Sequence, residues 1–103
     1  MNLTYKTPAD MRYSAKKMTK PISFFFAAPK AKSVCLTGDF NRWDPTSHPM
    51  QQREDGWWYL QVPLTHGHHL YQFVVDGEPT LDPHASGIKR NERDEPASLI
   101  AVS

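Results

Sequence analysis

The sequence predicts an all-β fold, an antiparallel sandwich of about seven short strands of immunoglobulin-like type. Short segments rich in aromatic and β-branched residues recur from residue 21 onward, and the turn pairs Asp55-Gly56 and Asp76-Gly77 each separate two of them. No long stretch has the apolar spacing of an amphipathic helix. Short strands separated by turn signals in this way are typical of a two-layered antiparallel sandwich.

The first two strands are expected after Pro21. Residues 22–27 read ISFFFA, a composition that favours a strand, and residues 29–32 contain the proline and polar residues of a turn. Residues 34–36 (VCL) then form a short apolar strand, which ends at Gly38-Asp39.

A hairpin is expected where residues 50–53 and 57–62 flank the Asp55-Gly56 pair. Alternation along the second strand separates two faces. The face that we expect to lie in the core holds Trp58, Leu60 and Val62, and the opposite face holds Trp57, Tyr59 and Gln61.

Another hairpin follows, in which residues 69–75 turn at Asp76-Gly77 into residues 79–81. Residues 82–96 are polar, contain two prolines and show no strand or helix period, so they are interpreted as a long loop that is functional or mobile. Residues 98–102 (SLIAV) close the chain as a final strand.

The length of 103 residues supports one domain with a single core. The net charge is only +1, but residues 1–20 form a basic arm, with Asp10 as their one acidic residue and five cations: Lys6, Arg12, Lys16, Lys17 and Lys20. We interpret residues 1–20 as a flexible arm, with a short helix that Thr7 caps and Pro8 opens, and residues 21–103 as the sandwich. A solvated tail is favoured over a contact with nucleic acid, because no aromatic platforms are interleaved with the charges.

Cys35 is the single cysteine and lies in an apolar strand, so a buried thiol in a reducing compartment is the simplest interpretation. No apolar run is long enough to cross a bilayer, and the N-terminus lacks the apolar region of a secretory signal. A cytoplasmic location without membrane contact is therefore expected.

The acidic residues argue against an enzyme. Hydrolysis of a glycosidic bond needs two carboxylates about 5 to 10 Å apart in a cleft, whereas nearly all Asp and Glu residues here lie in predicted turns. The serines have no nucleophile motif around them. We expect no catalytic residue and no cofactor.

One histidine cluster has spacing that could suit a metal, His66-x-His68-His69, and His48 or His84 would have to complete the site. Gly67 marks a turn within the cluster, and neither a cysteine nor a carboxylate flanks it. We therefore expect no metal site.

The segment after residue 36 is dense in turn-forming residues and holds one large aromatic side chain, Trp43. A ring on a stiff loop can stack on the C–H face of a pyranose, so Trp43 is the first candidate for sugar recognition. The alternative is that Trp43 packs under its own loop. Trp57, on the face opposite Trp58, is a second candidate, and its alternative is packing or contact with a partner protein.

The residues from Val34 to Trp43 resemble the opening of carbohydrate-binding module family 48, which reads V-x-L-x-G-x-F-N-x-W. The later blocks of that family, G-x-W and G-x-H-x-Y-x-F-x-V-D-G, are matched in order at residues 56–58 and 67–77. The family includes the N-terminal domains of isoamylases and glycogen branching enzymes and the glycogen-binding domain of the AMP-activated protein kinase beta subunit. The resemblance spans roughly residues 22–102 and implies an early-set immunoglobulin-like sandwich that binds α-glucan.

The resemblance also implies a ligand site, with Trp43 at the position of a glucan-stacking tryptophan. Two positions depart from the kinase-subunit type, which has a lysine where this chain has Gln72 and a second tryptophan where it has Pro79. Gln72 can still donate and accept hydrogen bonds. The later binding loop corresponds only loosely to residues 87–95, from which Asn91 is the candidate.

Two functions are thus open. The first is a non-catalytic module that binds α-glucan polysaccharide or oligosaccharide, alone or beside a glucan-metabolising enzyme, with the candidate contacts Trp43, Gln72, Trp57 and Asn91. The second is a protein-interaction module that keeps the sandwich and has lost sugar binding. An apolar outer patch around Trp57 and Tyr59 would favour the second function.

Overall fold

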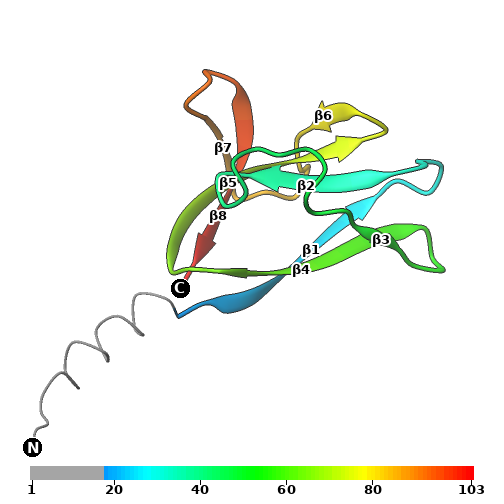
Figure 1. The fold of residues 1–103 in the computed structure, drawn as a ribbon, viewed down its shortest axis with the longest axis horizontal. Helices are drawn as coiled ribbons and strands as arrows, with labels where there is room; N and C mark the ends of the chain where they lie inside the picture. Colours follow the sequence, from blue (N-terminus) through cyan, green and yellow to red (C-terminus); the bar gives the residue numbers. More distant parts are fainter. Residues whose placement is uncertain (1–17) are drawn as a thin grey trace, which may run out of the picture.

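The computed structural model describes residues 18–103, which form two packed antiparallel sheets and no helix (Figure 1). Eight strands are present: β1 (Lys20–Ala27), β2 (Val34–Gly38), β3 (Gln51–Gln52), β4 (Trp57–Leu64), β5 (Gly67–Val75), β6 (Glu78–Thr80), β7 (Gly87–Arg90) and β8 (Pro96–Val102). The predicted all-β sandwich is confirmed. Residues 1–17, with the helix expected from Thr7, lie outside the described residues.

The smaller sheet has the order β1-β4-β3, and the larger has the order β2-β5-β8-β7, with β6 paired to β5. Both predicted hairpins are present, since Gln51 pairs with Tyr59 and Val75 pairs with Glu78. Gly56 and Gly77 both have φ of +88°, and Asp76 has φ of +50°, the left-handed backbone that tight hairpin turns require. β1 is an edge strand, because within residues 18–103 it pairs only with β4.

The core lies between the two sheets. Inward residues of the smaller sheet include Phe24, Trp58 and Val62, and those of the larger sheet include Leu36 and Phe73. The predicted inward face of β4 is confirmed, with Leu60 partly buried against the same cluster. Period-2 alternation therefore sets which side chains of each sheet meet.

Several residues of the three sequence blocks that resemble the family (34–43, 56–58 and 67–77) hold the sandwich together. Gly38 has no room for a side chain, because a Cβ there would meet the Leu70 carbonyl oxygen at 2.6 Å. The Asp39 N–H donates to the Leu70 carbonyl, and the Asp39 carboxylate accepts the Leu70 N–H, each at 3.0 Å. Asp76 accepts the N–H groups of Lys32 and Ser33 at 2.8 and 2.9 Å and so fixes the turn before β2. These blocks specify the scaffold.

Two expectations from the sequence are corrected. Residues 82–96 are not an irregular loop throughout, because β7 forms within them and pairs with β8, Ile88 facing Ser98. Its pattern was hidden because Gly87–Arg90 is short and mostly exposed. Cys35 is half-buried where a buried thiol was expected, and this burial still raises the pKa of the thiol. Between Met18 and Ser103 no helix has the length and apolar character needed to cross a membrane.

Candidate functional site

The four predicted contact residues do not converge on one site. Gln72 alternates with the inward residues Tyr71 and Phe73 of β5, so it lies on the outer face of the larger sheet. Trp57 alternates with Trp58 on β4 and lies on the outer face of the smaller sheet. The two side chains therefore lie on opposite outer faces of the sandwich.

Trp43 is buried, with 7% of its surface exposed, so the expectation of an open stacking ring is wrong. The loop closes on itself because the Asn41 amide contacts the Gly38 N–H, the Leu36 carbonyl and the Ser47 hydroxyl at 3.0 to 3.1 Å. Arg42 and Trp43 both adopt left-handed backbone conformations, with φ of 59° and 60°. This compact turn favours the alternative in which the indole packs under its own loop.

Asn91 is also buried, with 8% of its surface exposed. Its Oδ1 accepts the N–H groups of Arg93 and Glu95 at 2.9 and 3.0 Å, and its own N–H donates to the Glu95 carbonyl. Its Nδ2 has no partner in residues 18–103. Asn91 therefore shapes the tip of the β7–β8 hairpin and sets the position of Glu95 and Pro96 from within.

Gln72 lies in a groove of about 640 Å³ on the outer face of the larger sheet. The lining of this feature, which we call the Gln72 groove, comes from β5, the β6 segment and the start of β8: Gln72, Pro79, Thr80, Leu81, Glu95 and Pro96. The Gln72 Nε2 donates to the Pro96 carbonyl, which fixes the amide and leaves its Oε1 as an acceptor.

The Gln72 groove combines apolar rings with a few polar groups. Pro79, Leu81 and Pro96 supply apolar surface, and Glu95 is its single charged side chain among the described residues. The Thr80 hydroxyl donates to the Glu78 carbonyl at 3.1 Å and so supplies an acceptor. Such a surface suits a neutral, hydroxyl-bearing ligand. Sequence reasoning named Gln72 as a contact, Pro79 as a departure from the kinase-subunit type and residues 87–95, which include Glu95, as the loose counterpart of the binding loop. It did not name Pro96 as a contact.

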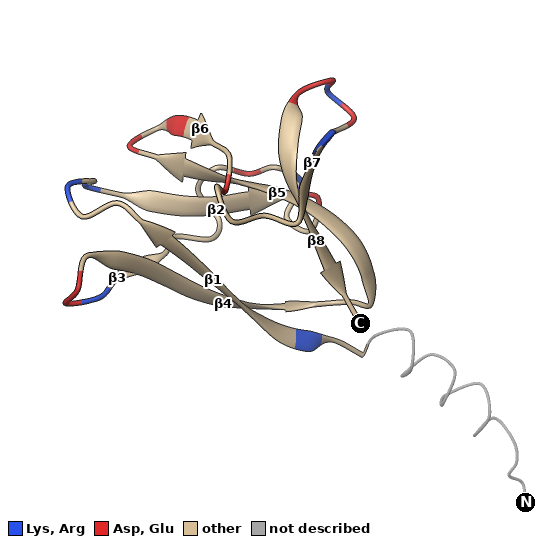
Figure 2. Ribbon diagram, turned by 180° about the vertical axis from the view of Figure 1, so that it is seen from behind, with Lys and Arg blue, Asp and Glu red and all other residues tan. Residues whose placement is uncertain are grey.

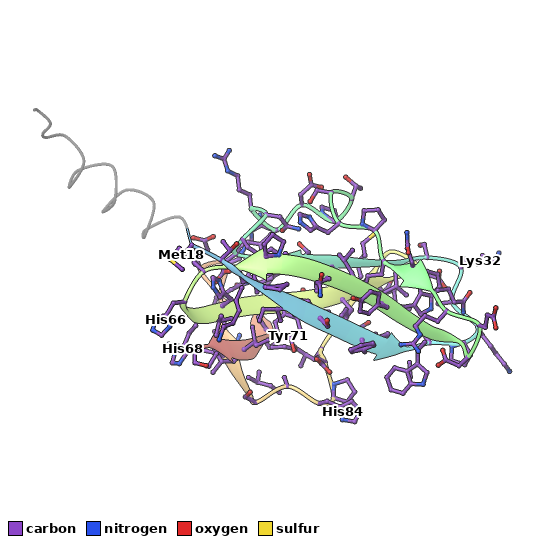
Figure 3. The ribbon with its side chains drawn as sticks, turned by 90° about the horizontal axis from the view of Figure 1, so that it is seen from below. Met18, Lys32, His66, His68, Tyr71 and His84 are labelled. Atoms are coloured by element: carbon purple, nitrogen blue, oxygen red, sulfur yellow. The ribbon has the colours of Figure 1, made fainter. Side chains whose placement is uncertain are left out.

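The histidines do not gather. Figure 3 shows His66 and His68 near the Met18 end of the sandwich and His84 well apart from them. His69 lies between Asp39 and Thr65, with 3.3 Å from its Nδ1 to the carboxylate and 2.9 Å from its Nε2 to the Thr65 carbonyl. Among residues 18–103 no three His, Cys, Asp or Glu side chains are placed to hold a metal ion.

Charged residues lie mainly in the loops and at the hairpin tips (Figure 2). The sequences of β1 and β4 contain a single charge, Lys20, at the start of β1. The face of the smaller sheet is therefore nearly neutral, which does not favour binding of a polyanion there.

Comparison with known proteins agrees with the resemblance of the sequence blocks. Residues 11–91 match a family described as Carbohydrate-binding module 48 (Isoamylase N-terminal domain). A 1,4-alpha-glucan branching enzyme of Synechococcus sp. (strain CC9605) is 37% identical over 83 residues, which is 78% of this chain and 11% of that enzyme. A second such enzyme, from Xanthomonas campestris pv. campestris (strain 8004), is 34% identical over 85 residues, 80% of this chain and 11% of the enzyme. The chain thus spans about a tenth of the length of these relatives.

Proposed function

Since this chain belongs to the carbohydrate-binding module 48 family, we propose that it binds α-glucan of the glycogen or starch type and performs no catalysis. The observation that carries the proposal is the Gln72 groove, whose described lining offers polar and apolar groups together with a single charged side chain, Glu95. An α-glucan presents apolar C–H faces and hydroxyl groups in the same ligand. Its hydroxyls would meet Gln72, Thr80 and Glu95, and its C–H faces would meet the rings of Pro79 and Pro96.

The affinity expected for this groove is weak. Proline rings and Leu81 stack less strongly on a sugar than an exposed indole would, and Trp43 is buried in this structure. We therefore expect a dissociation constant on the order of 1 mM for a short oligosaccharide, or about −4 kcal/mol. Longer polymers would bind more tightly by offering many equivalent segments.

A binding role without catalysis is supported by the charges of the groove. Glycosidic chemistry uses two carboxylates on either side of the bond, and among the described residues the Gln72 groove has only Glu95. The matched relatives are branching enzymes, but this chain covers about a tenth of each. The proposal therefore assigns this chain the task of holding glucan beside a glucan-metabolising enzyme, in the reducing cytoplasm where the Cys35 thiol stays free.

The proposal is tested by titrating ¹⁵N-labelled protein with maltoheptaose and recording amide shifts. Saturable shifts at the Gln72 side-chain amide and at the Glu95 N–H are expected, and Gln72→Ala should weaken binding about fivefold or more. The matched control is Gln61→Ala, an exposed glutamine on the other sheet that does not line this groove. Cellohexaose, with β linkages, controls for the linkage. Absence of any shift up to about 10 mM maltoheptaose would end the proposal.

A further inference from the structure

A second groove lies on the open side of the sandwich, along the unpaired edge of β1. It consists of two adjoining hollows of about 240 and 330 Å³ that share Phe25, Asp82 and His84. One wall is β1 from Ser23 to Ala27, and the other is the segment from Thr80 to Ser86. Tyr71 and His84 lie on the same side of β1 in Figure 3. We call this feature the β1 groove.

Five aromatic residues line the β1 groove, and two of them, Phe25 and Trp57, are outward residues of their strands. Phe25 has 41% of its surface exposed and lines both hollows, and Trp57 reaches the smaller one from β4. Phe25 also contacts Tyr59, with ring centroids 5.1 Å apart. Accessible rings beside a hollow are the feature that the Gln72 groove lacks, and they can stack on the C–H face of a pyranose.

The polar groups of the β1 groove are held in place by the fold. The Asp82 carboxylate accepts the Tyr71 hydroxyl at 2.6 Å and the His84 N–H at 2.8 Å, and the Asp82 N–H donates to the Ser98 hydroxyl at 2.8 Å. Each carboxylate oxygen keeps a further acceptor position. The hydroxyls of Ser23 and Ser86, both exposed, add donors along the same hollow. The site is thus formed before a ligand arrives.

The charges of the β1 groove favour a neutral ligand rich in hydroxyl groups. Its described lining contains no Lys or Arg, and the Arg53 guanidinium lies beside it, over the Phe25 ring at 5.9 Å from the centroid. A phosphate or carboxylate placed at Asp82 would be repelled by that carboxylate. A partner with apolar side chains would cover the Asp82 carboxylate and leave its free acceptor positions unpaired, which is costly. Sugar hydroxyls satisfy those positions, while the sugar ring covers Phe25.

We propose that the β1 groove is a second glucan-binding site, in which Phe25 and Trp57 stack on glucosyl rings and Asp82, His84 and Ser86 hold their hydroxyls. The ligand class rests on the proposed function, but the site does not include Gln72. The two grooves share Thr80 and Leu81 and therefore adjoin, so neighbouring segments of one α-glucan polymer occupy them.

The experiment is a maltoheptaose titration of the full chain followed by amide and indole shifts. The Trp57 indole N–H and the His84 and Ser86 amides report on the β1 groove, and the Gln72 side-chain amide reports on the other. Phe25→Ala should weaken the affinity reported by the Trp57, His84 and Ser86 signals about five- to tenfold. It should leave the affinity reported by the Gln72 side-chain amide unchanged. The matched control is Ile88→Ala, since Ile88 is 63% exposed and lines neither groove. His84→Ala is a second variant that leaves β1 intact.

The outcomes separate the two proposals. Saturable shifts at the β1 groove that Phe25→Ala weakens and Gln72→Ala does not would support the second site. Shifts confined to the Gln72 groove would overturn the second site and leave the proposed function standing. Absence of shifts at both grooves in the unmodified chain would overturn both proposals. Concentration-dependent broadening of β1 amides without sugar, together with dimers in sedimentation, would overturn the second site by showing that β1 pairs with a second copy.

Discussion

The hydroxyl of Tyr71 donates a hydrogen bond of 2.6 Å to Oδ2 of Asp82, joining the central strand β5 to the connection between β6 and β7. Phe24 packs edge-on against the Tyr71 ring at 5.0 Å, so the same residue also bridges the two sheets. One tyrosine therefore links the core to the wall of the β1 groove.

Replacing Tyr71 with phenylalanine should remove this link without changing the packing of the ring. The Asp82 carboxylate would lose its buried donor, and the free energy of unfolding should fall by about 1 to 3 kcal/mol. Urea denaturation followed by tryptophan fluorescence measures this change. Tyr59→Phe is the matched control, because Tyr59 lies on the outer face of β4, and a change below about 0.5 kcal/mol is expected there. Equal effects of the two variants would contradict the assigned role.

Tyr71 should also make the stability depend on alkaline pH. Burial raises its pKa, and the hydrogen bond and charge of Asp82 raise it further. In the unfolded chain a tyrosine ionises near pH of about 10, so above that pH the folded protein binds more protons than the unfolded chain. Its contribution to stability is fully present below about pH 10 and is lost as the pH rises beyond it.

The measurement compares wild type with Tyr71→Phe by urea denaturation at about pH 9 and about pH 11. The stability advantage of the wild type should shrink at the higher pH, because only the wild type has this ionisation. A constant advantage would show that Tyr71 ionises normally in the folded protein, and a growing one would show that its pKa is lowered there; either would contradict the prediction.

Trp43→Ala should act mainly on stability. The side chain is buried, so its removal should lower the free energy of unfolding by about 3 to 5 kcal/mol through lost packing and the cavity left behind. Trp57→Ala, at a half-buried outer position, should cost clearly less. Acrylamide quenching of single-tryptophan variants gives an independent readout, in which Trp57 should be quenched more readily than Trp43. A stable Trp43→Ala variant that had lost sugar binding would restore Trp43 as an open platform.

Asn91→Ala should weaken glucan binding indirectly. The Asn91 Oδ1 holds the N–H groups of Arg93 and Glu95, so the variant should free the hairpin tip and cost about 1 to 2 kcal/mol of stability. The Glu95 and Pro96 wall of the Gln72 groove would lose its fixed position. Hydrogen exchange at Glu95 and a maltoheptaose titration measure the two effects. Asn91→Asp retains an acceptor oxygen for the two N–H groups and should recover part of the loss. A failure of Asn91→Ala to alter exchange would contradict this role.

Local sequence patterns were enough to predict the strands and hairpins. The alternation of β4 and β5 identifies which side chains face the core, because neighbouring residues of a strand point to opposite faces. The Asp55-Gly56 and Asp76-Gly77 pairs identify turns, because few residue types adopt left-handed backbone conformations. These signals depend only on residues that are close in the sequence. The three ordered sequence blocks identified the family. The short β7 was missed because four mostly exposed residues have no apolar alternation.

The all-β class, the two hairpins, the inward faces and the family all follow from the order of residues in the chain. Which candidate residues share a surface depends on how the strands pack in space. Gln72 and Trp57 are both outward residues of their strands, but their strands belong to different sheets, and sheet membership depends on pairing between distant segments. The β1 groove has the same cause, because its walls, β1 and residues 80–86, are separated in the chain.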